Sequence, residues 1–319
     1  MTDFSFYSRS ESGHRLEYIK FSESQLGGVR IAGLSLIKTP KPLLFLMVEE
    51  SFLLYVLISL VRSLLGRRTV GLVFRAKECV QGNSLRLKIK YAIMRALRHI
   101  NNVKSVSIVP FFVCPEVENI CDYWIHDFQF WDREFLESLT CESEVVEVIE
   151  YIKAKAAGRK ILCAVGKQDK SKGFDEFIRL YLSSEQLREE YLFVSGGKIS
   201  GIDSELVKAF EGSGGLLIDK RISDSELVAL YKAADVIWVC YAPDYDQSSG
   251  ILGRALQYEL AVIVRGGSVI ESLAKNKVHL IQCGDDTVDC LMSYKFIKNS
   301  EAEGVTLSSK KTLLDGLLA

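Results

Sequence analysis

The chain has 319 residues, of which 48% are hydrophobic, and this is enough apolar material for the cores of two domains of ordinary size. Its 40 basic and 41 acidic residues leave a formal charge of −1, a balance that excludes nucleic acid as the principal partner. The eight cysteines form no CxxC pair, which predicts reduced, structural thiols in a cytoplasmic protein.

The first residues lack a basic stretch followed by an apolar core, so we expect no signal peptide and a cytoplasmic chain. The most apolar segment, residues 51–65, is too short for a membrane span and contains Arg62. Two interpretations of this segment stay open. It is either a buried core helix or a helix whose apolar and basic surface rests peripherally on the anionic inner face of the plasma membrane.

Strands and helices alternate through the first half of the sequence, which predicts a parallel sheet. The first strand leads through a turn that contains Gly13 into a helix that starts at His14, without the GxGxxG pattern of a dinucleotide clamp. Apolar runs predict strands at residues 3–8, 29–36, 43–48, 69–75 and 103–109. Helical periodicity predicts helices at residues 14–23, 51–65 and 84–100.

Two segments of the first half carry candidate functional side chains. Residues 85–99 hold five lysine or arginine residues and His99, either as a solvated helix face or as a contact surface for the phosphate groups of an acceptor or a membrane. Aromatic residues crowd around His126 and Asp127 in the segment 121–132. This cluster is either the wall of a sugar or nucleotide site or the edge of a core.

A charged helical connector at residues 133–159 leads into the second half. We therefore predict an N-terminal domain at residues 1–155 and a C-terminal domain at 156–300. Residues 301–319 are expected to form a tail or helix that packs back on the N-terminal domain.

In the second half, a strand at 160–165 precedes a glycine-bounded loop with three lysines at 167, 170 and 172, and a helix at 174–182. Positive charge beside a helix start favours anion binding, although scattered surface lysines are the simpler interpretation. Further strands are predicted at 191–195 and 216–219. A capping box, Ser223 with Glu226, opens a helix that ends near Ala234.

The stretch from Leu227 to Gly267 organises this half. Two buried strands at 236–240 and 261–265 enclose a polar loop and a helix at 251–259. The loop leaves the carboxyl end of a strand, where open α/β sheets bind ligands. The loop delivers an acid, an amide and two hydroxyls to the start of the helix. It is either a cradle for an anion or simply the cap of the helix. The residues concerned are Asp246, Gln247, Ser248 and Ser249, followed by Gly250.

These motifs, in this order, resemble the C-terminal domain of retaining GT-B glycosyltransferases of the family 4 type (glycosyl transferases group 1), which include many bacterial polysaccharide and lipopolysaccharide enzymes. The resemblance covers residues 160–275, and the first half matches in arrangement only, through residues 12–15 after the first strand. It implies an α/β GT-B fold, with two Rossmann-like domains whose parallel sheets face one another across a cleft. The second domain would hold a nucleotide-sugar and the first an acceptor.

The resemblance also implies donor-binding residues. A basic residue and a lysine five positions later contact the donor diphosphate in this family, and here these positions hold Lys167 and Lys172. In this family, two glutamates eight positions apart contact the donor sugar and the ribose. The corresponding positions hold Asp246 and Arg254, and Arg254 has the opposite charge to a glutamate. Gly13 would let the first turn approach the phosphates closely.

The remaining polar residues of the organising loop would complete the diphosphate site: Gln247, Ser248, Ser249 and Gly250. By the same resemblance, the acceptor hydroxyl would attack with retention of anomeric configuration. The candidates for an acid or base near the acceptor are His126, Asp127 and His14.

The sequence Asp244-Tyr245-Asp246 spells DxD, a metal-binding pattern of another glycosyltransferase fold. Carboxylates that alternate along an extended chain point in opposite directions, so we predict a metal-independent reaction with no cofactor beside the nucleotide-sugar co-substrate.

Three hypotheses about function follow. The first is a transferase that moves a sugar to a glycan or lipid-linked glycan in cell-surface polysaccharide biosynthesis. The second is a catalytically degenerate nucleotide- or glycan-binding partner subunit, and the third is a nucleotide-sugar epimerase on the same fold.

Overall fold

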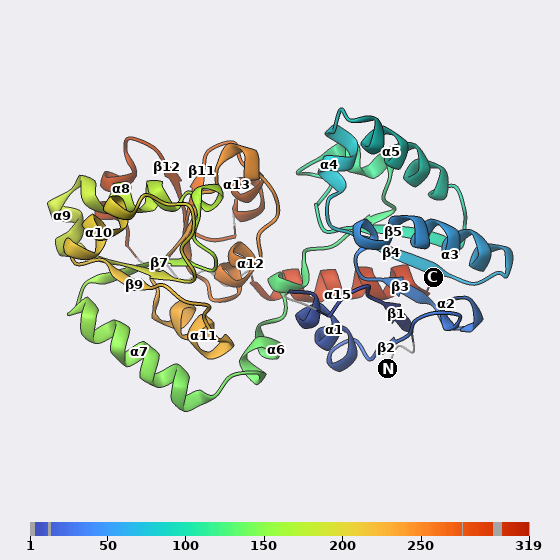
Figure 1. Cartoon of the computed structure of the whole chain (residues 1–319), viewed down its shortest axis with the longest axis horizontal. Coiled ribbons are helices and arrows are strands. Elements are labelled where there is room, and N and C mark those ends of the chain that lie inside the picture. The colour runs from blue at the N-terminus through green and yellow to red at the C-terminus, as the bar shows by residue number, and fades with distance from the viewer. Residues whose placement is uncertain (1–3, 12–13, 276, 296–301, 319) are drawn as a thin grey trace. The chain divides into compact units, whose positions relative to one another are not determined.

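Two six-stranded sheets organise the chain, and every strand pair that the structure describes is parallel. The structure is a computed structural model that describes residues 4–11, 14–275, 277–295 and 302–318. Each sheet belongs to a separate unit (Figure 1). Unit 1 contains the residues up to Phe128 and those from Gly304 onward, and unit 2 runs from Gln129 to Glu303.

The sheet of unit 1 has the strand order β2-β1-β3-β4-β5-β6. Its strands are β1 (Ser5–Tyr7), β2 (Val29–Arg30), β3 (Leu43–Phe45), β4 (Thr69–Val73), β5 (Val103–Ser107) and β6 (Tyr123–Trp124). Its helices are α1 (His14–Ser24), α2 (Ser35–Lys38), α3 (Phe52–Leu64), α4 (Ala76–Gln81), α5 (Leu85–Leu97) and α15 (Ala302–Leu318).

Helices cover both faces of this sheet, as a parallel sheet requires. One face packs on α2 to α5 through a shared core that includes Leu36, Tyr55 and Met94. On the other face, the Tyr18 ring of α1 contacts the Phe74 ring, at 5.3 Å between centroids, while Gly316 of α15 lies against Val106 of β5.

A buried arginine fixes the position of α3. The Arg62 guanidinium is fully buried and donates five hydrogen bonds of 2.7–3.1 Å, one to the hydroxyl of Thr69 and four to backbone carbonyls of residues 36, 39, 41 and 68. Burial, with the charge of Arg67 nearby, lowers its pKa to about 10, so Arg62 remains charged at neutral pH. The segment 51–65 is therefore a helix packed on the sheet by one face. Among the described residues, no helix combines the length and the apolar character that crossing a bilayer requires.

The sheet of unit 2 has the strand order β12-β11-β10-β7-β8-β9, which is the order of a Rossmann fold. Its strands are β7 (Lys160–Val165), β8 (Tyr191–Gly196), β9 (Leu216–Ile218), β10 (Val236–Val239), β11 (Ala261–Arg265) and β12 (Leu280–Cys283). Its helices are α6 (Arg133–Ser138), α7 (Glu142–Ala156), α8 (Phe174–Ser183), α9 (Glu185–Glu190), α10 (Ser204–Gly212), α11 (Asp224–Ala233), α12 (Gly250–Gln257), α13 (Val269–Ala274) and α14 (Thr287–Ser293).

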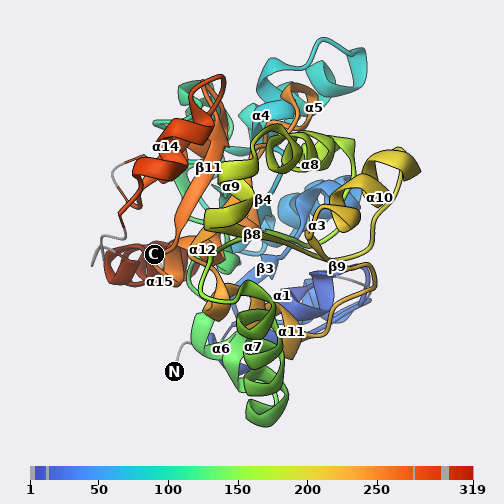
Figure 2. The ribbon, with the colours of Figure 1, turned by 90° about the vertical axis from the view of Figure 1, so that its left-hand side faces the viewer.

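Figure 2 shows α7 and α11 on one side of these strands and α8, α9 and α10 on the other. One core joins α8, α9, α10 and α14 to the sheet through buried aromatic rings, among them Phe177, Phe193 and Trp238. A capping box, in which Ser223 and Glu226 bond reciprocally, opens α11 as predicted.

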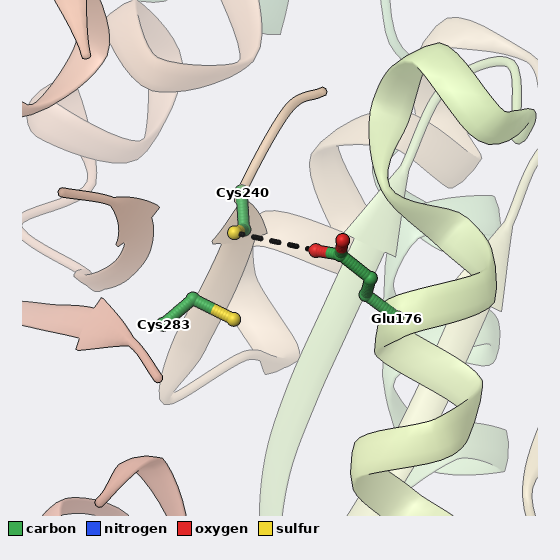
Figure 3. A group of neighbouring side chains, drawn as sticks. All are labelled: Glu176, Cys240 and Cys283. Atoms are coloured by element: carbon green, nitrogen blue, oxygen red, sulfur yellow. Dashed lines mark hydrogen bonds between the residues drawn. The ribbon is translucent and has the colours of Figure 1, made fainter. Parts of the chain in front are cut away.

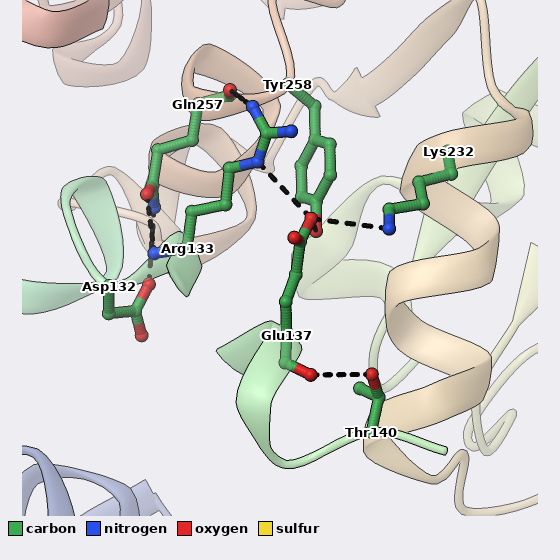
Figure 4. A network of polar contacts seen from close by, with 7 residues as sticks. All are labelled: Asp132, Arg133, Glu137, Thr140, Lys232, Gln257 and Tyr258. Atoms are coloured by element: carbon green, nitrogen blue, oxygen red, sulfur yellow. Dashed lines mark hydrogen bonds and ion pairs between the residues drawn. The ribbon is translucent and has the colours of Figure 1, made fainter. Parts of the chain in front are cut away.

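The division between the units lies at residues 128 and 129, whereas we predicted it at 155 and 156. Polar contacts fasten the connecting segment to unit 2 (Figure 4). The Arg133 amide donates to Gln257 Oε1 at 2.7 Å, and Glu137 accepts from the Tyr258 hydroxyl at 2.9 Å and pairs with Lys232 at 3.5 Å. These partners lie about a hundred residues further along the chain, so the local sequence gives no sign of them.

Two other details bear on the predictions. The predicted strand at 29–36 ends at Arg30, because Gly33, at φ +61°, turns the chain into α2. All eight cysteines are free, as predicted, and burial raises the pKa of Cys79, Cys121 and Cys163 and keeps them protonated.

Replacing Arg62 by methionine should destabilise unit 1 by at least about 3 kcal/mol, because several buried carbonyls would lose their donors. The opening free energy of β3 and β4, measured by amide hydrogen exchange, reports this loss. Arg95→Met, at an exposed position of α5, is the control and should stay within about 0.5 kcal/mol of the parent. Equal protection in the two variants would contradict the anchoring role of Arg62.

Candidate functional site

The candidate site of unit 2 lies at the carboxyl ends of β7 and β10. These neighbouring strands form the switch point of the sheet, since the chain continues from β7 to β8 on one side and from β10 to β11 on the other. Open α/β sheets bind ligands at such a point. Two loops emerge there, at residues 166–173 and 240–249, and together they contain most of the predicted donor-binding residues.

The loop at residues 166–173 meets its neighbours at positions that only glycine can occupy. Gly173 has φ +64°, and a Cβ atom there would lie 2.1 Å from the carbonyl oxygen of Cys240. Gly197, at φ +143°, approaches Gly166 so closely that a Cβ would lie 1.8 Å from its oxygen. The Ala242 amide donates to the Ser171 carbonyl at 3.0 Å and closes the contact. The glycines therefore set the position of the lysine-bearing loop.

Lys172 projects from this loop against two tyrosine rings. Its Nζ lies 3.8 Å from the ring centroid of Tyr241 and 4.7 Å from that of Tyr245. Burial lowers the pKa of Lys172, although Tyr245 and Asp169 oppose this shift. The arrangement keeps an ammonium group partly desolvated at the switch point, where attraction to an anion is stronger than in water.

Lys167 is exposed, and its Nζ pairs with Asp169 Oδ2 at 2.9 Å. The other carboxylate oxygen of Asp169 accepts from the Ser171 hydroxyl at 2.5 Å and from the Lys172 amide at 3.2 Å. Partial burial opposes ionisation of Asp169, but Ser171 and Lys167 outweigh it and hold its pKa below the usual value. Asp169 and the two tyrosines are parts of this site that sequence reasoning missed.

The second loop ends at the start of α12. Ser249 caps this helix by accepting from the Leu252 amide at 3.4 Å, and its hydroxyl lies 2.7 Å from that of Tyr241. The Ser248 hydroxyl oxygen is buried without a hydrogen-bond partner among the described residues. Gly250 leaves room for the side chain of Gln129, which a Cβ would meet at 1.5 Å. The loop thus brings together capping groups and one unused hydroxyl.

The two acidic residues of this loop differ in their surroundings. Asp246 Oδ1 accepts from the Val269 amide at 2.8 Å, at the start of α13, and lies 3.5 Å from an Arg265 nitrogen. Asp244 and Gln247 are exposed. The Asp246 carboxylate is therefore held by the start of α13 and by Arg265, whereas Asp244 faces solvent.

Arg254 has an internal partner that the local sequence does not reveal. It is 6% exposed, and its guanidinium lies 3.4 Å from the carboxylate of Asp132, which is also buried. Gln257 donates to Asp132 at 3.2 Å and to the Gln129 carbonyl at 2.9 Å. These contacts attach α12 to the segment 129–132, so the structure gives Arg254 a part in holding α12.

The predicted acid or base candidates lie in unit 1. The side chains of His126 and Asp127 are both buried. Asp127 accepts from the Tyr18 hydroxyl at 2.5 Å, and the His126 ring lies 5.4 Å from that of Trp124. Gly13 lies outside the described residues, as does the side chain of His14, which begins α1.

A groove of about 1080 Å³ opens in unit 1 near the carboxyl ends of β1 and β4 and beside the start of α3. Strands β1 and β3 form the switch point of this sheet, so the groove occupies the corresponding ligand-binding position. Its lining combines cationic with acidic and apolar side chains, including Arg9, Glu50, Phe52, Arg75, Arg86 and Lys90. Sequence reasoning missed this groove, because its lining comes from four separate segments.

Three side chains beside the lysine loop could hold a metal ion. Glu176 of α8, Cys240 after β10 and Cys283 of β12 place their ligand atoms within 4.8 Å of one another, and Figure 3 shows them pointing toward a common space. The Cys240 Sγ lies 3.9 Å from Glu176 Oε2. Two sulfurs and a carboxylate are ligands that Zn²⁺ accepts.

No protein-family model and no curated protein sequence matches this chain. Among solved structures, Anabaena HepE in complex with UDP and glucose is similar, with a TM-score of 0.57 and 9% identity over 99% of this chain and 95% of that one. The N-terminal domain of Candida albicans trehalose-6-phosphate phosphatase gives 0.56 and 13%, over 97% and 74% of the two chains. Sucrose-phosphate synthase from Thermosynechococcus elongatus gives 0.54 and 11%, over 99% and 95%.

Both parallel sheets align with these structures, and unit 2 has the Rossmann strand order. The chain therefore has the GT-B fold, with two Rossmann-like domains.

Proposed function

We propose that this chain is a retaining glycosyltransferase that moves a sugar from a nucleotide-sugar to a glycan or lipid-linked glycan in cell-surface polysaccharide biosynthesis. The observation that carries the proposal is the pair of loops at the switch point of unit 2. These loops hold Lys172, Lys167 and the start of α12 at the carboxyl ends of β7 and β10. Anabaena HepE, which shares the fold, has been solved with UDP and glucose and with UDP-glucose.

The donor diphosphate would bind to the lysine loop and the start of α12. Cleavage of the glycosyl–phosphate bond leaves negative charge on the diphosphate, and a lysine held in a partly desolvated position stabilises that charge effectively. The first amides of α12 have no intrahelical acceptors and can donate to phosphate oxygens. Ser248 offers a hydroxyl whose oxygen has no described partner.

The acceptor would bind in the groove of unit 1. Its cationic residues, such as Arg9 and Arg75, suit a phosphate-bearing acceptor, and its apolar residues suit a lipid or the face of a sugar ring. His126 and Asp127 remain our candidates for proton transfer. Asp127 is the better supported of the two, because the hydrogen bond that it accepts from the Tyr18 hydroxyl fixes the orientation of its carboxylate.

We propose a metal-independent reaction, since lysines and helix amides supply the charge stabilisation that a metal would otherwise give. The group of Glu176, Cys240 and Cys283 is the place to examine if a chelator changes activity. We also propose that the protein works at the cytoplasmic face of the membrane, where lipid-linked acceptors are accessible.

A degenerate partner subunit is the second candidate function. The internal contacts of Asp246 and Arg254 favour it. These residues occupy the two positions of the family glutamates, and they bind the Val269 amide and the Asp132 carboxylate within the protein.

Incubation with nucleotide-sugars labelled in the sugar, together with a bacterial lipid-linked glycan fraction, separates these functions. A transferase moves label to the acceptor and yields the same anomeric configuration as the donor, with or without chelator. Binding of donor without any product would support the partner subunit, and conversion of the free nucleotide-sugar would identify an epimerase.

Lys172→Ala should weaken donor binding by about 1.5–3 kcal/mol, or roughly ten- to 150-fold in Kd, because a charged hydrogen bond to phosphate is lost. Isothermal titration with the nucleotide-sugar measures the change. Lys170→Ala removes an exposed lysine from the same turn and should leave Kd within about twofold. Equal effects of the two substitutions would contradict the assignment of Lys172.

Asp246→Asn should reduce discrimination between nucleotide-sugars more than affinity for the bare nucleoside diphosphate. The asparagine side chain can still accept the hydrogen bond from the Val269 amide. It lacks the negative charge that pairs with Arg265 and that would make the carboxylate a strong acceptor for sugar hydroxyls. Competition binding with several sugar conjugates measures selectivity, and Asp244→Asn serves as the exposed control. A parallel loss for sugar conjugates and bare nucleotide would place Asp246 away from the sugar.

A further inference from the structure

Helix α3 presents an apolar stripe to the surface of unit 1. Leu53, Leu57, Leu60 and Leu64 recur at helical spacing, and the first and last of them are 79% and 89% exposed. The solvent-facing side of a helix in a soluble protein is normally polar. Four exposed leucines in one row, followed by exposed Leu65, form a patch of the kind that marks an interaction surface.

The stripe cannot turn inward, because the opposite side of α3 is already packed. Tyr55 and Ile58 are buried in the core of unit 1, and Arg62 makes five hydrogen bonds to neighbouring segments. Rotating the helix to bury the leucines would break all of these bonds. The exposed leucines are thus a fixed feature of the fold.

Helix α5 adds apolar and cationic groups beside this stripe. Leu85 and Ile89 are exposed, Leu85 by 74%, and exposed basic residues flank them: Arg86, Lys88 and Arg95. Leu53, Leu85 and Ile89 all line the groove of unit 1, so the two helices meet there. We call these exposed residues of α3 and α5, together with Leu65, the α3/α5 face.

The charge of the chain is strongly segregated. From Ser51 to Lys104, eleven residues are lysine or arginine and one, Glu78, is acidic, which gives this segment a formal charge of +10. The rest of the chain carries −11, since the total is −1. The helices with the exposed leucines therefore lie in the one strongly cationic segment of an otherwise acidic sequence.

We propose that the α3/α5 face docks on an anionic lipid bilayer. Exposed leucines can enter the boundary between headgroups and acyl chains, while the surrounding lysines and arginines attract anionic headgroups. The distribution of charge favours a bilayer over a protein partner. The cations of α5 surround the exposed apolar residues, and this pattern is complementary to anionic headgroups around an apolar interior.

This surface also specifies the acceptor, an inference that rests on the proposed glycosyl transfer. The groove opens between α3 and α5, and its apolar rim includes Leu53 and Leu85, with Arg9 and Arg75 also in the lining. A lipid-linked acceptor with a phosphate headgroup could enter it directly from the bilayer, so that apolar contacts meet the lipid and arginines meet the phosphate.

Sedimentation with vesicles tests the docking without donor or acceptor, so the result is independent of whether sugar transfer occurs. The full chain should bind vesicles of phosphatidylcholine with 30% phosphatidylglycerol at least about tenfold more tightly than pure phosphatidylcholine, and added salt should weaken the binding.

Two variants separate the two parts of the face. The double substitution Leu57→Gln with Leu64→Gln and the double substitution Lys88→Gln with Arg95→Gln should each weaken binding to anionic vesicles about tenfold or more. Val146→Gln with Lys208→Gln, at exposed positions of unit 2, is the matched control and should bind like the parent chain. All altered residues are at the surface, and circular dichroism checks that each variant is folded.

Failure of the parent chain to sediment with anionic vesicles would overturn the proposal and leave a protein partner as the occupant of this face. Equal binding of the control and the two α3/α5 variants would also overturn it. If vesicles bind as expected but no acceptor receives sugar, the docking surface stands and the proposed transfer fails.

Discussion

The contact between the two loops at the switch point of unit 2 is the constraint on which the candidate site depends. Gly173 lies against the Cys240 carbonyl at a distance that no side chain permits, and Gly197, which follows β8, approaches Gly166 of the lysine-bearing loop as closely. Because strand ends and backbone fix this contact, Lys172 is held beside Tyr241 and the start of α12. A positive group is thus held in place by the fold itself, and such preorganisation is what the proposed stabilisation of a departing diphosphate requires.

Each unit uses a buried arginine to hold a helix next to its candidate binding surface. In unit 1, Arg62 fixes α3 and so keeps the leucine stripe at the surface. In unit 2, Arg254 pairs with Asp132 and attaches α12 to the segment 129–132. Removing one partner of a buried charged contact costs far more than an exposed ion pair contributes. These anchors therefore link the stability of each unit to the position of its candidate binding surface.

Much of the fold could be predicted from the sequence, because unbroken apolar runs such as residues 160–165 and 236–239 fit only strands buried on both faces. The lysine loop and the capped start of α12 were also predictable from local spacing. The roles of Asp132, Gln129 and the groove were not, since their contacts join residues far apart in the chain. Long-range contacts also explain why the boundary between the units was predicted too late in the chain. Hydrogen bonds of Arg133 and Glu137 to distant residues join the charged connector to unit 2, so the boundary lies before the connector.

The most direct test of the account is thermal denaturation of the purified chain against a panel of nucleoside diphosphates and their sugar conjugates, each with and without chelator. A ligand that binds only the folded state must raise its stability. We predict that one nucleoside diphosphate and its sugar conjugate raise the unfolding temperature, and that chelator leaves the shift unchanged. Absence of a shift with every member of the panel would contradict a nucleotide-sugar site at the loops around Lys172.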